Sequence, residues 1–205
     1  MDKWYGHNNV GIETHPFPPF LPARATHLIL GTFPTHPKNR RFHFFYAGRN
    51  NFFWRLLGDV YSYRFDTTHG EEAIREREKF LIRNNIALYN VIYRCRRIVA
   101  HSSKDTDLEV IEKSDVLGLI DQLPKLKTIV LAGSSGAISP RQLFLDHLQE
   151  NNIAVLIKEE GNLISGSFTF GKRRIDFKTV YSTSGTNIGR YSPALEQYKK
   201  ALNKF

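Results

Sequence analysis

Short apolar runs recur along the chain, and each has the length of a single β-strand. Within each run the apolar residues are nearly continuous, which is typical of strands buried on both faces in a parallel sheet. The runs cover residues 27–31, 86–92, 128–133, 153–157 and 177–181. The pattern therefore predicts a sheet whose strands come from widely separated parts of the chain.

The segments between these runs have helical spacing of apolar residues or helix start signals. Predicted helices cover residues 52–59, 71–84, 114–122, 139–150 and 192–203. Ser114 and Ser139 are suitable N-caps, and proline follows Ser139 and Ser192 at the first helical position. Strands that alternate with helices indicate a three-layer α/β sandwich with a mainly parallel central sheet.

Two segments depart from this alternation. Residues 167–177 predict a β-hairpin around Gly171-Lys172, which we interpret as an insertion before the final core strand. Residues 1–26 are rich in proline and predict an irregular N-terminal arm. The chain has 205 residues, of which 41% are apolar, so residues 1–205 are expected to form one domain with its own core.

Charge and cysteine content narrow the classes of function. The formal net charge of +9 favours a polyanionic partner such as nucleic acid. A single cysteine, Cys95, excludes an intramolecular disulfide and a cysteine-held iron–sulfur cluster. No apolar run approaches the roughly 20 residues of a membrane span, and residues 1–6 lack signal-peptide character. We expect a cytoplasmic protein without membrane contact, metal or cofactor.

Small polar loops follow four of the predicted strands, at residues 31, 90, 133 and 182 onward. Ligands of open α/β sheets bind at the carboxyl ends of strands, so these loops are the candidate site. The first loop begins Gly31-Thr32-Phe33-Pro34 and leads to an aromatic stretch that contains Tyr46. An exposed aromatic ring there can stack on a base, but packing in the core is an equally good interpretation of Tyr46.

Several blocks in these loops resemble the uracil-DNA glycosylase superfamily, and within it the hypoxanthine- and uracil-acting branch, the DNA-deoxyinosine glycosylases. They occur in the order of that family and span residues 15–190. The blocks are 28–35 (LILGTFPT), 46–54 (YAGRNNFFW), 88–92 (LYNVI), 131–133 (LAG) and 181–187 (YSTSGTN). The resemblance implies a monofunctional, metal-free DNA glycosylase that releases uracil or hypoxanthine from duplex or single-stranded DNA, and we expect it to be a monomer.

The resemblance also implies how the site divides its work. Tyr46 would stack on an extruded base that Phe33, Gly133 and Ser134 hold, with the Phe33 and Ser134 amides as donors. Thr32 of the first loop or Asn51 would position the attacking water. An amide is not a general base at neutral pH, so Asn51 would only orient that water. A plain helix N-cap is the alternative interpretation of Asn51.

The last loop and one basic cluster would contact the leaving base and the DNA backbone. Ser182 would stabilise the departing base, and Ser184 and Gly185 would hold a phosphate. Thr186, Asn187 or Ile188 would fill the gap that the flipped base leaves. Arg94 and Arg96 are candidate phosphate contacts, although a run of charges is often only a solvated surface.

Three departures from the family pattern keep other functions open. Ala132 stands where the family has a base-reading asparagine, Asn90 replaces an aspartate, and Gly185 replaces a proline. A catalytically weakened DNA-binding module or a nucleoside or nucleotide hydrolase would also fit these residues. The glycosylase interpretation requires Tyr46, Asn51 and Ser184 to converge on one cavity that admits a nucleobase.

Overall fold

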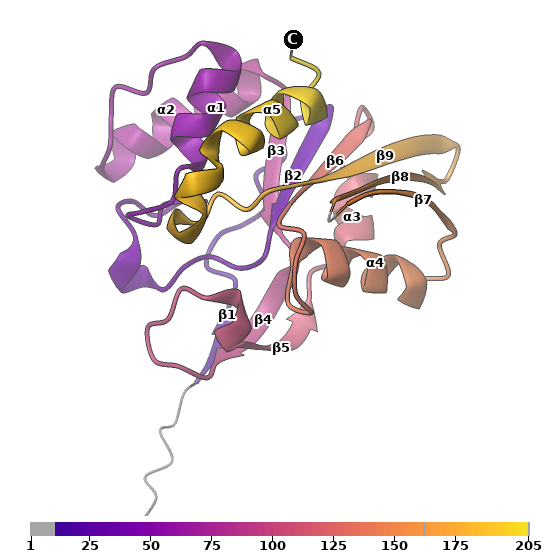
Figure 1. Cartoon of the computed structure of the whole chain (residues 1–205), viewed down its shortest axis with the longest axis horizontal. Coiled ribbons are helices and arrows are strands. Elements are labelled where there is room, and N and C mark those ends of the chain that lie inside the picture. Colours follow the sequence, from indigo (N-terminus) through magenta and orange to yellow (C-terminus); the bar gives the residue numbers. More distant parts are fainter. Residues whose placement is uncertain (1–10, 162, 205) are drawn as a thin grey trace, which may run out of the picture.

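The computed structural model describes residues 11–161 and 163–204, and a six-stranded sheet runs through its centre (Figure 1). The strand order is β3-β2-β6-β9-β8-β7. The strands are β2 His27–Gly31, β3 Ile86–Asn90, β6 Thr128–Ala132, β7 Val155–Glu160, β8 Leu163–Phe170 and β9 Arg173–Val180. β3, β2, β6 and β9 pair in parallel, while β8 and β7 are antiparallel to their neighbours. The predicted α/β class with a mainly parallel sheet is confirmed.

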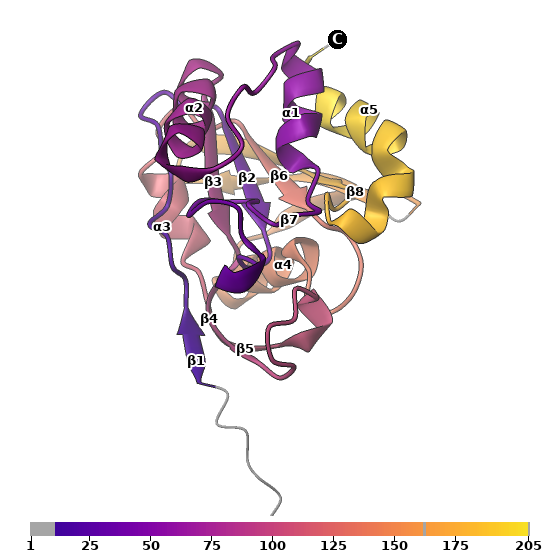
Figure 2. The same ribbon diagram turned by 90° about the vertical axis from the view of Figure 1, so that its left-hand side faces the viewer.

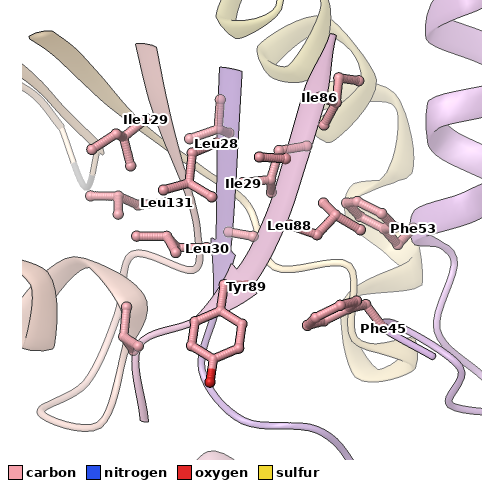
Figure 3. Close-up of a cluster of buried hydrophobic side chains, with 14 of the residues drawn as sticks. Leu28, Ile29, Leu30, Phe45, Phe53, Ile86, Leu88, Tyr89, Ile129 and Leu131 are labelled. Atoms are coloured by element: carbon pink, nitrogen blue, oxygen red, sulfur yellow. The ribbon is translucent and has the colours of Figure 1, made fainter. Parts of the chain in front are cut away.

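The core of the sheet lies in β3, β2 and β6. Every residue of β3 and β6 is buried, which explains their uninterrupted apolar sequences. Ile29 of β2 is in register with Leu88 of β3 on one side and Val130 of β6 on the other. Figure 3 shows the side chains of Leu28, Ile29 and Leu30 between those of the two flanking strands.

Helices cover both faces of the sheet. α1 (Phe53–Tyr61), α2 (Gly70–Arg83) and α5 (Tyr191–Ala201) lie on one face, and α3 (Val116–Asp121) and α4 (Pro140–Glu150) lie on the other (Figures 1 and 2). The rings of Phe53 in α1 and Tyr198 in α5 are 6.2 Å apart, and those of Phe144 in α4 and Phe177 in β9 are 5.6 Å apart. Among the described residues, no helix is long and apolar enough to span a bilayer.

Of the three serines predicted to cap helices, Ser139 is right, whereas Ser114 and Ser192 are wrong. The Ser139 hydroxyl accepts a hydrogen bond from the amide of Gln142, as expected for the N-cap of α4. Asp115 caps α3 instead of Ser114, because its carboxylate accepts from the amide of Gly118 at 2.9 Å. α5 begins at Tyr191, so Ser192 lies inside the first turn.

A second, antiparallel sheet was not predicted. It has the order β1-β4-β5, formed by β1 (Ile12–Thr14), β4 (Ile92–Arg97) and β5 (Leu108–Lys113). β1 belongs to the predicted irregular arm, of which residues 1–10 lie outside the described residues. Phe20, further along this arm, also bridges Leu88 in β3, the edge strand of the central sheet. The arm is therefore more regular than its prolines suggest.

Two expectations about the far side of the sheet need correction. The predicted fourth core strand is β7, an edge strand in which 74% of Leu156 is exposed, so it is not buried on both faces. The predicted hairpin is present, since Phe170 pairs with Arg173 around its turn. However, β9 continues without a break to Val180, so the hairpin forms part of the central sheet and is not an insertion.

Candidate functional site

The ends of four parallel strands place the predicted loops along one edge of the sheet. β3 ends at Asn90, β2 at Gly31, β6 at Ala132 and β9 at Val180, and all four strands run in the same direction. The loops that follow them therefore lie side by side, as the sequence predicts. This edge is the candidate site.

Gly31 lies at the most crowded point of this edge. A Cβ atom at this position would lie 2.7 Å from Nδ2 of Asn90 and 2.9 Å from the hydroxyl oxygen of Tyr46. Only glycine leaves room for both side chains. Asn90 is itself held from behind, because its Oδ1 accepts from Nε2 of buried His15 at 3.0 Å. The Asn90 side chain is therefore held beside Gly31 by its hydrogen bond to His15.

The ring of Tyr46 is packed on one face, and its hydroxyl has no hydrogen-bond partner among the described residues. One ring face stacks on Phe53, with centroids 3.7 Å apart and planes inclined by 15°. Its hydroxyl is buried and has no hydrogen-bond partner among the described residues. Burial raises the pKa of the Tyr46 phenol, and the nearby charge of Asp105 raises it further. The phenol therefore stays protonated and offers an unused donor.

The side-chain oxygen of Asn51 holds two segments together beside the start of α1, although the N-cap residue of that helix is Phe52. Its Oδ1 accepts from the amide of Phe53 at 2.9 Å, next to the start of α1. The same oxygen accepts from the hydroxyl of Thr183 at 3.0 Å. A backbone N–H can only donate, so the bond from the Phe53 amide identifies which end of the Asn51 side-chain amide is the oxygen. With Oδ1 occupied twice, Asn51 can offer a substrate only its Nδ2 donor.

The last loop lies directly against the segment that contains Asn51. The amide of Phe52 donates to the carbonyl of Thr183, and a Cβ at Gly185 would lie 2.6 Å from the Cβ of Asn50. The absence of a side chain at Gly185 therefore allows this close approach. The hydroxyl of Ser182 accepts from the amide of Ser184 and braces the turn.

The short helix η3 (Gly185–Arg190) carries the remaining predicted residues of this loop. The hydroxyls of Ser184 and Thr186 are 3.2 Å apart, and Asn187 donates its amide to the Ser184 carbonyl. The side chain of Ile188 is 52% exposed. Its apolar, outward position suits the predicted role of filling a gap in DNA.

A cavity of about 470 Å³ lies beside α1 and brings two of the three key residues together. Tyr46 and Asn51 both line it, and Trp54, Arg55, Arg64 and Arg77 form other parts of its wall. Ser184 does not line this cavity. The expected convergence is therefore present for Tyr46 and Asn51, while the last loop reaches only Asn51 of the two, through Thr183.

The loops after β2 and β6 supply free main-chain donors. Among the described residues, neither the amide of Phe33 nor that of Ser134 donates a hydrogen bond. Arg141 of α4 fixes the Ser134 segment by donating to its carbonyl at 3.3 Å. Ala132 and Gly133 are buried, and nothing in the Ala132 side chain can replace the family's asparagine. Any base reading here has to use backbone groups or the serine hydroxyls.

Asp105 is the site residue that sequence reasoning missed. It lies between β4 and β5, yet its Oδ2 accepts from the hydroxyl of Thr32 at 2.7 Å, next to the end of β2. Burial raises the pKa of the Asp105 carboxyl to about 6, although the Thr32 hydrogen bond and the charge of Arg97 oppose the shift. Within its polar surroundings in the sequence, residues 102–107, nothing distinguishes it from a surface aspartate.

Arg94 and Arg96 lie on β4, which begins at Ile92, shortly after β3 ends at Asn90. Arg96 pairs with Glu109 at 2.7 Å and Arg94 with Glu112 at 3.5 Å, and both arginines stay partly exposed. These carboxylates offset part of the positive charge that the sequence suggested for DNA contact. Exposed pairs of this kind break at little cost, so their role as phosphate contacts stays a prediction.

The site contains no recognisable cluster of metal ligands. Residues 11–161 and 163–204 include no group of three or more His, Cys, Asp or Glu side chains that could hold a metal ion. Cys95 is buried in β4, and burial raises the pKa of its thiol to about 11. Such a thiol is a poor nucleophile at neutral pH.

The chain is similar in sequence to one known DNA glycosylase and in fold to another protein of this kind. No protein-family profile matches the chain. A hypoxanthine DNA glycosylase from Methanosarcina barkeri is 30% identical over 125 residues, which is 60% of this chain and 74% of the relative. The solution structure of a provisionally assigned uracil DNA glycosylase from Methanosarcina acetivorans superposes with a TM-score of 0.61 at 23% identity. That superposition covers 94% of this chain and 99% of the other.

The parallel sheet, its two helical layers and the polar loops at the strand ends define an α/β protein with its site at one edge of the sheet. The chain belongs to the uracil-DNA glycosylase superfamily.

Proposed function

We propose that the protein is a monofunctional DNA glycosylase that hydrolyses the N-glycosidic bond of a deaminated base, uracil or hypoxanthine, in DNA. The observation that carries the proposal is that Tyr46 and Asn51 line one cavity and that Thr183 of the last loop donates to Asn51, in a chain of this superfamily. The net charge of +9 suits a DNA partner. The chain would act as a monomer.

Unused donors at the site favour deaminated bases. Deamination replaces an amino group with a carbonyl oxygen, so it converts a hydrogen-bond donor on the base into an acceptor. The free amides of Phe33 and Ser134 are donors. These N–H groups can donate to the carbonyl oxygen of uracil or hypoxanthine. The amino group of cytosine or adenine is itself a donor, so it would leave them without an acceptor. This choice needs no side-chain amide at Ala132.

Binding would require the nucleotide to leave the stack, at a cost of a few kcal/mol. Tyr46 offsets part of this cost by stacking, and exposed Ile188 fills the space left in the duplex. Ser182 donates a hydroxyl to the departing base, which stabilises the base anion less than a cation would. Asn51 donates from Nδ2 to the oxygen of the attacking water.

The test uses oligonucleotides that carry uracil, hypoxanthine, cytosine or adenine at one position, in duplex and single-stranded form. Alkaline cleavage then reveals abasic sites. We expect abasic sites only at uracil or hypoxanthine, and an equal yield with Arg174→Gln, a control at the opposite end of β9 from the site. No abasic site from any substrate would overturn the proposal. Tight binding to abasic DNA in that case would favour the DNA-binding module.

We further propose a cytoplasmic location. The single, buried cysteine suits a reducing compartment, because the protein draws no stability from disulfides.

A further inference from the structure

Asp105 contributes a carboxylate to a site whose sequence motifs contain none. We propose that Asp105 binds the attacking water and removes its proton, and that Thr32 holds the carboxylate in place. This inference rests on the proposed function, because it names the base for the same hydrolysis. It assigns a catalytic role to the loop between β4 and β5, which carries none of the blocks that resemble the family.

The loop is tied to the site by contacts that do not involve Asp105. Arg97 is 2% exposed, and its guanidinium donates to the carbonyls of Ser102 and Pro34, one in each loop. Glu13 of β1 holds the same guanidinium, with Nε 2.8 Å from Oε1. Asn39 adds a second link by donating to the carbonyl of His101 at 3.0 Å. Asp105 is therefore presented from a braced loop.

The two carboxylate oxygens of Asp105 have different surroundings. Oδ2 accepts from Thr32, whereas Oδ1 accepts no hydrogen bond from any described residue. Oδ1 is not fully enclosed by the described residues. Thr32 thus fixes one oxygen and leaves the other free for a water molecule.

The site needs an acceptor because Asn51 cannot supply one. Both hydrogen bonds that reach Asn51 end on its Oδ1, from Phe53 and Thr183. Its remaining Nδ2 group can only donate to the water oxygen, which orients the water without making it more nucleophilic. A water that attacks carbon must lose a proton, and Oδ1 of Asp105 can take it.

The groups around Asp105 hold the pKa of its carboxyl group in a range that suits a general base. Arg97 faces it from β4, Tyr46 from the aromatic stretch and Thr32 from the end of β2. Arg97 and Thr32 favour the ionised form, while burial opposes it and brings the pKa to about 6. A base with this pKa is ionised at neutral pH, and it binds a proton more readily than an exposed aspartate.

The reaction balances with water as the only co-reactant. The N-glycosidic bond breaks, and its electron pair stays on the nitrogen of the departing base. The water oxygen bonds to C1′ of the deoxyribose as its proton passes to Oδ1 of Asp105. The base anion then takes a proton from solvent, and Asp105 releases its own to solvent. The products are the free base and an abasic site.

Single-turnover base release as a function of pH tests this assignment. For the wild type the rate should rise with pH through about 6 and then level off, because the ionised carboxylate is active. Asp105→Asn should lower the plateau roughly a hundredfold or more, abolish this inflection, and leave the Kd for DNA within about twofold. Thr32→Val removes a donor to the ionised form, so the inflection should move to higher pH.

Asp107→Asn is the matched control, since Asp107 lies in the same loop and its carboxylate only accepts from Ser102. It should retain the wild-type rate and inflection. An Asp105→Asn variant with the wild-type pH profile, or with equal losses of base release and DNA affinity, would overturn the role of Asp105 alone. A wild type that releases no base would overturn the proposed function, and this inference with it.

Discussion

The hydroxyl of Thr183 donates to Oδ1 of Asn51 at 3.0 Å and thereby joins loops that are 132 residues apart in the sequence. The contact does more than hold the loops together. Because the amide of Phe53 donates to the same oxygen, the Asn51 side chain is locked in one orientation with Nδ2 turned outward. The start of α1 and the last loop are therefore tied to the same side chain.

Two substitutions of Asn51 separate these functions. Asn51→Asp keeps an oxygen for Phe53 and Thr183 but removes the Nδ2 donor, so the free energy of unfolding should hardly change while base release falls sharply. Asn51→Ala removes both and should also lower the free energy of unfolding by about 1 kcal/mol. Urea denaturation, the Kd for DNA and single-turnover base release measure the three effects. If Asn51→Asp releases base at the wild-type rate, Asn51 serves only as a cap.

Tyr46→Phe tests whether the unused hydroxyl is kept for a ligand. A buried hydroxyl without a partner costs about 1–3 kcal/mol, so its removal should stabilise the free protein. Base release should nevertheless fall, because a donor kept for the ligand is lost. Tyr46→Ala, which also removes the stacking ring, should weaken capture of the flipped base by about 1–3 kcal/mol. Unchanged base release in Tyr46→Phe would show that the hydroxyl has no such role.

The parts of the fold that follow from local rules were predictable from the sequence. The uninterrupted apolar runs identified the three central strands, and Ser139 with Pro140 gave the start of α4. The same rules did not distinguish an edge strand from a central one. Residues 153–157 are as apolar as a buried run, but their position at the end of the sheet leaves Leu156 exposed. That position depends on strand order, which a single run does not encode.

The site was predictable where it lies at strand ends and not where a distant loop completes it. Tyr46, Asn51 and the last loop follow strands or precede helices, so a rule about strand ends locates them. Asp105 reaches Thr32 only because the unpredicted small sheet and the Arg97–Glu13 pair fold its loop back. Nothing periodic in residues 98–107 indicates that contact.

Asp105 should cost the protein stability in a pH-dependent way. Its folded pKa of about 6 lies above the ordinary aspartate value of about 3.9, so the folded state binds this proton more tightly than the unfolded state. The contribution of the group to stability therefore falls as pH rises from about 4 to 6. Relative to the wild type, Asp105→Asn should raise the free energy of unfolding by about 3 kcal/mol at pH 8 and by much less at pH 4. Urea denaturation at both pH values checks this, and an equal gain at both would contradict it.

Ile188 should matter for duplex DNA and not for single strands. Its side chain is 52% exposed on η3, directly after the loop that contacts Asn50 and Asn51. In a duplex, an apolar side chain can occupy the gap left by the flipped base and slow its return, whereas a single strand has no such gap. Ile188→Ala should therefore reduce base release from duplex DNA roughly tenfold and leave single-stranded release unchanged. Leu156→Ala, which shortens an even more exposed side chain on the distant edge strand β7, should change neither rate. Equal losses on both substrates would mean that Ile188 supports the loop rather than the open duplex.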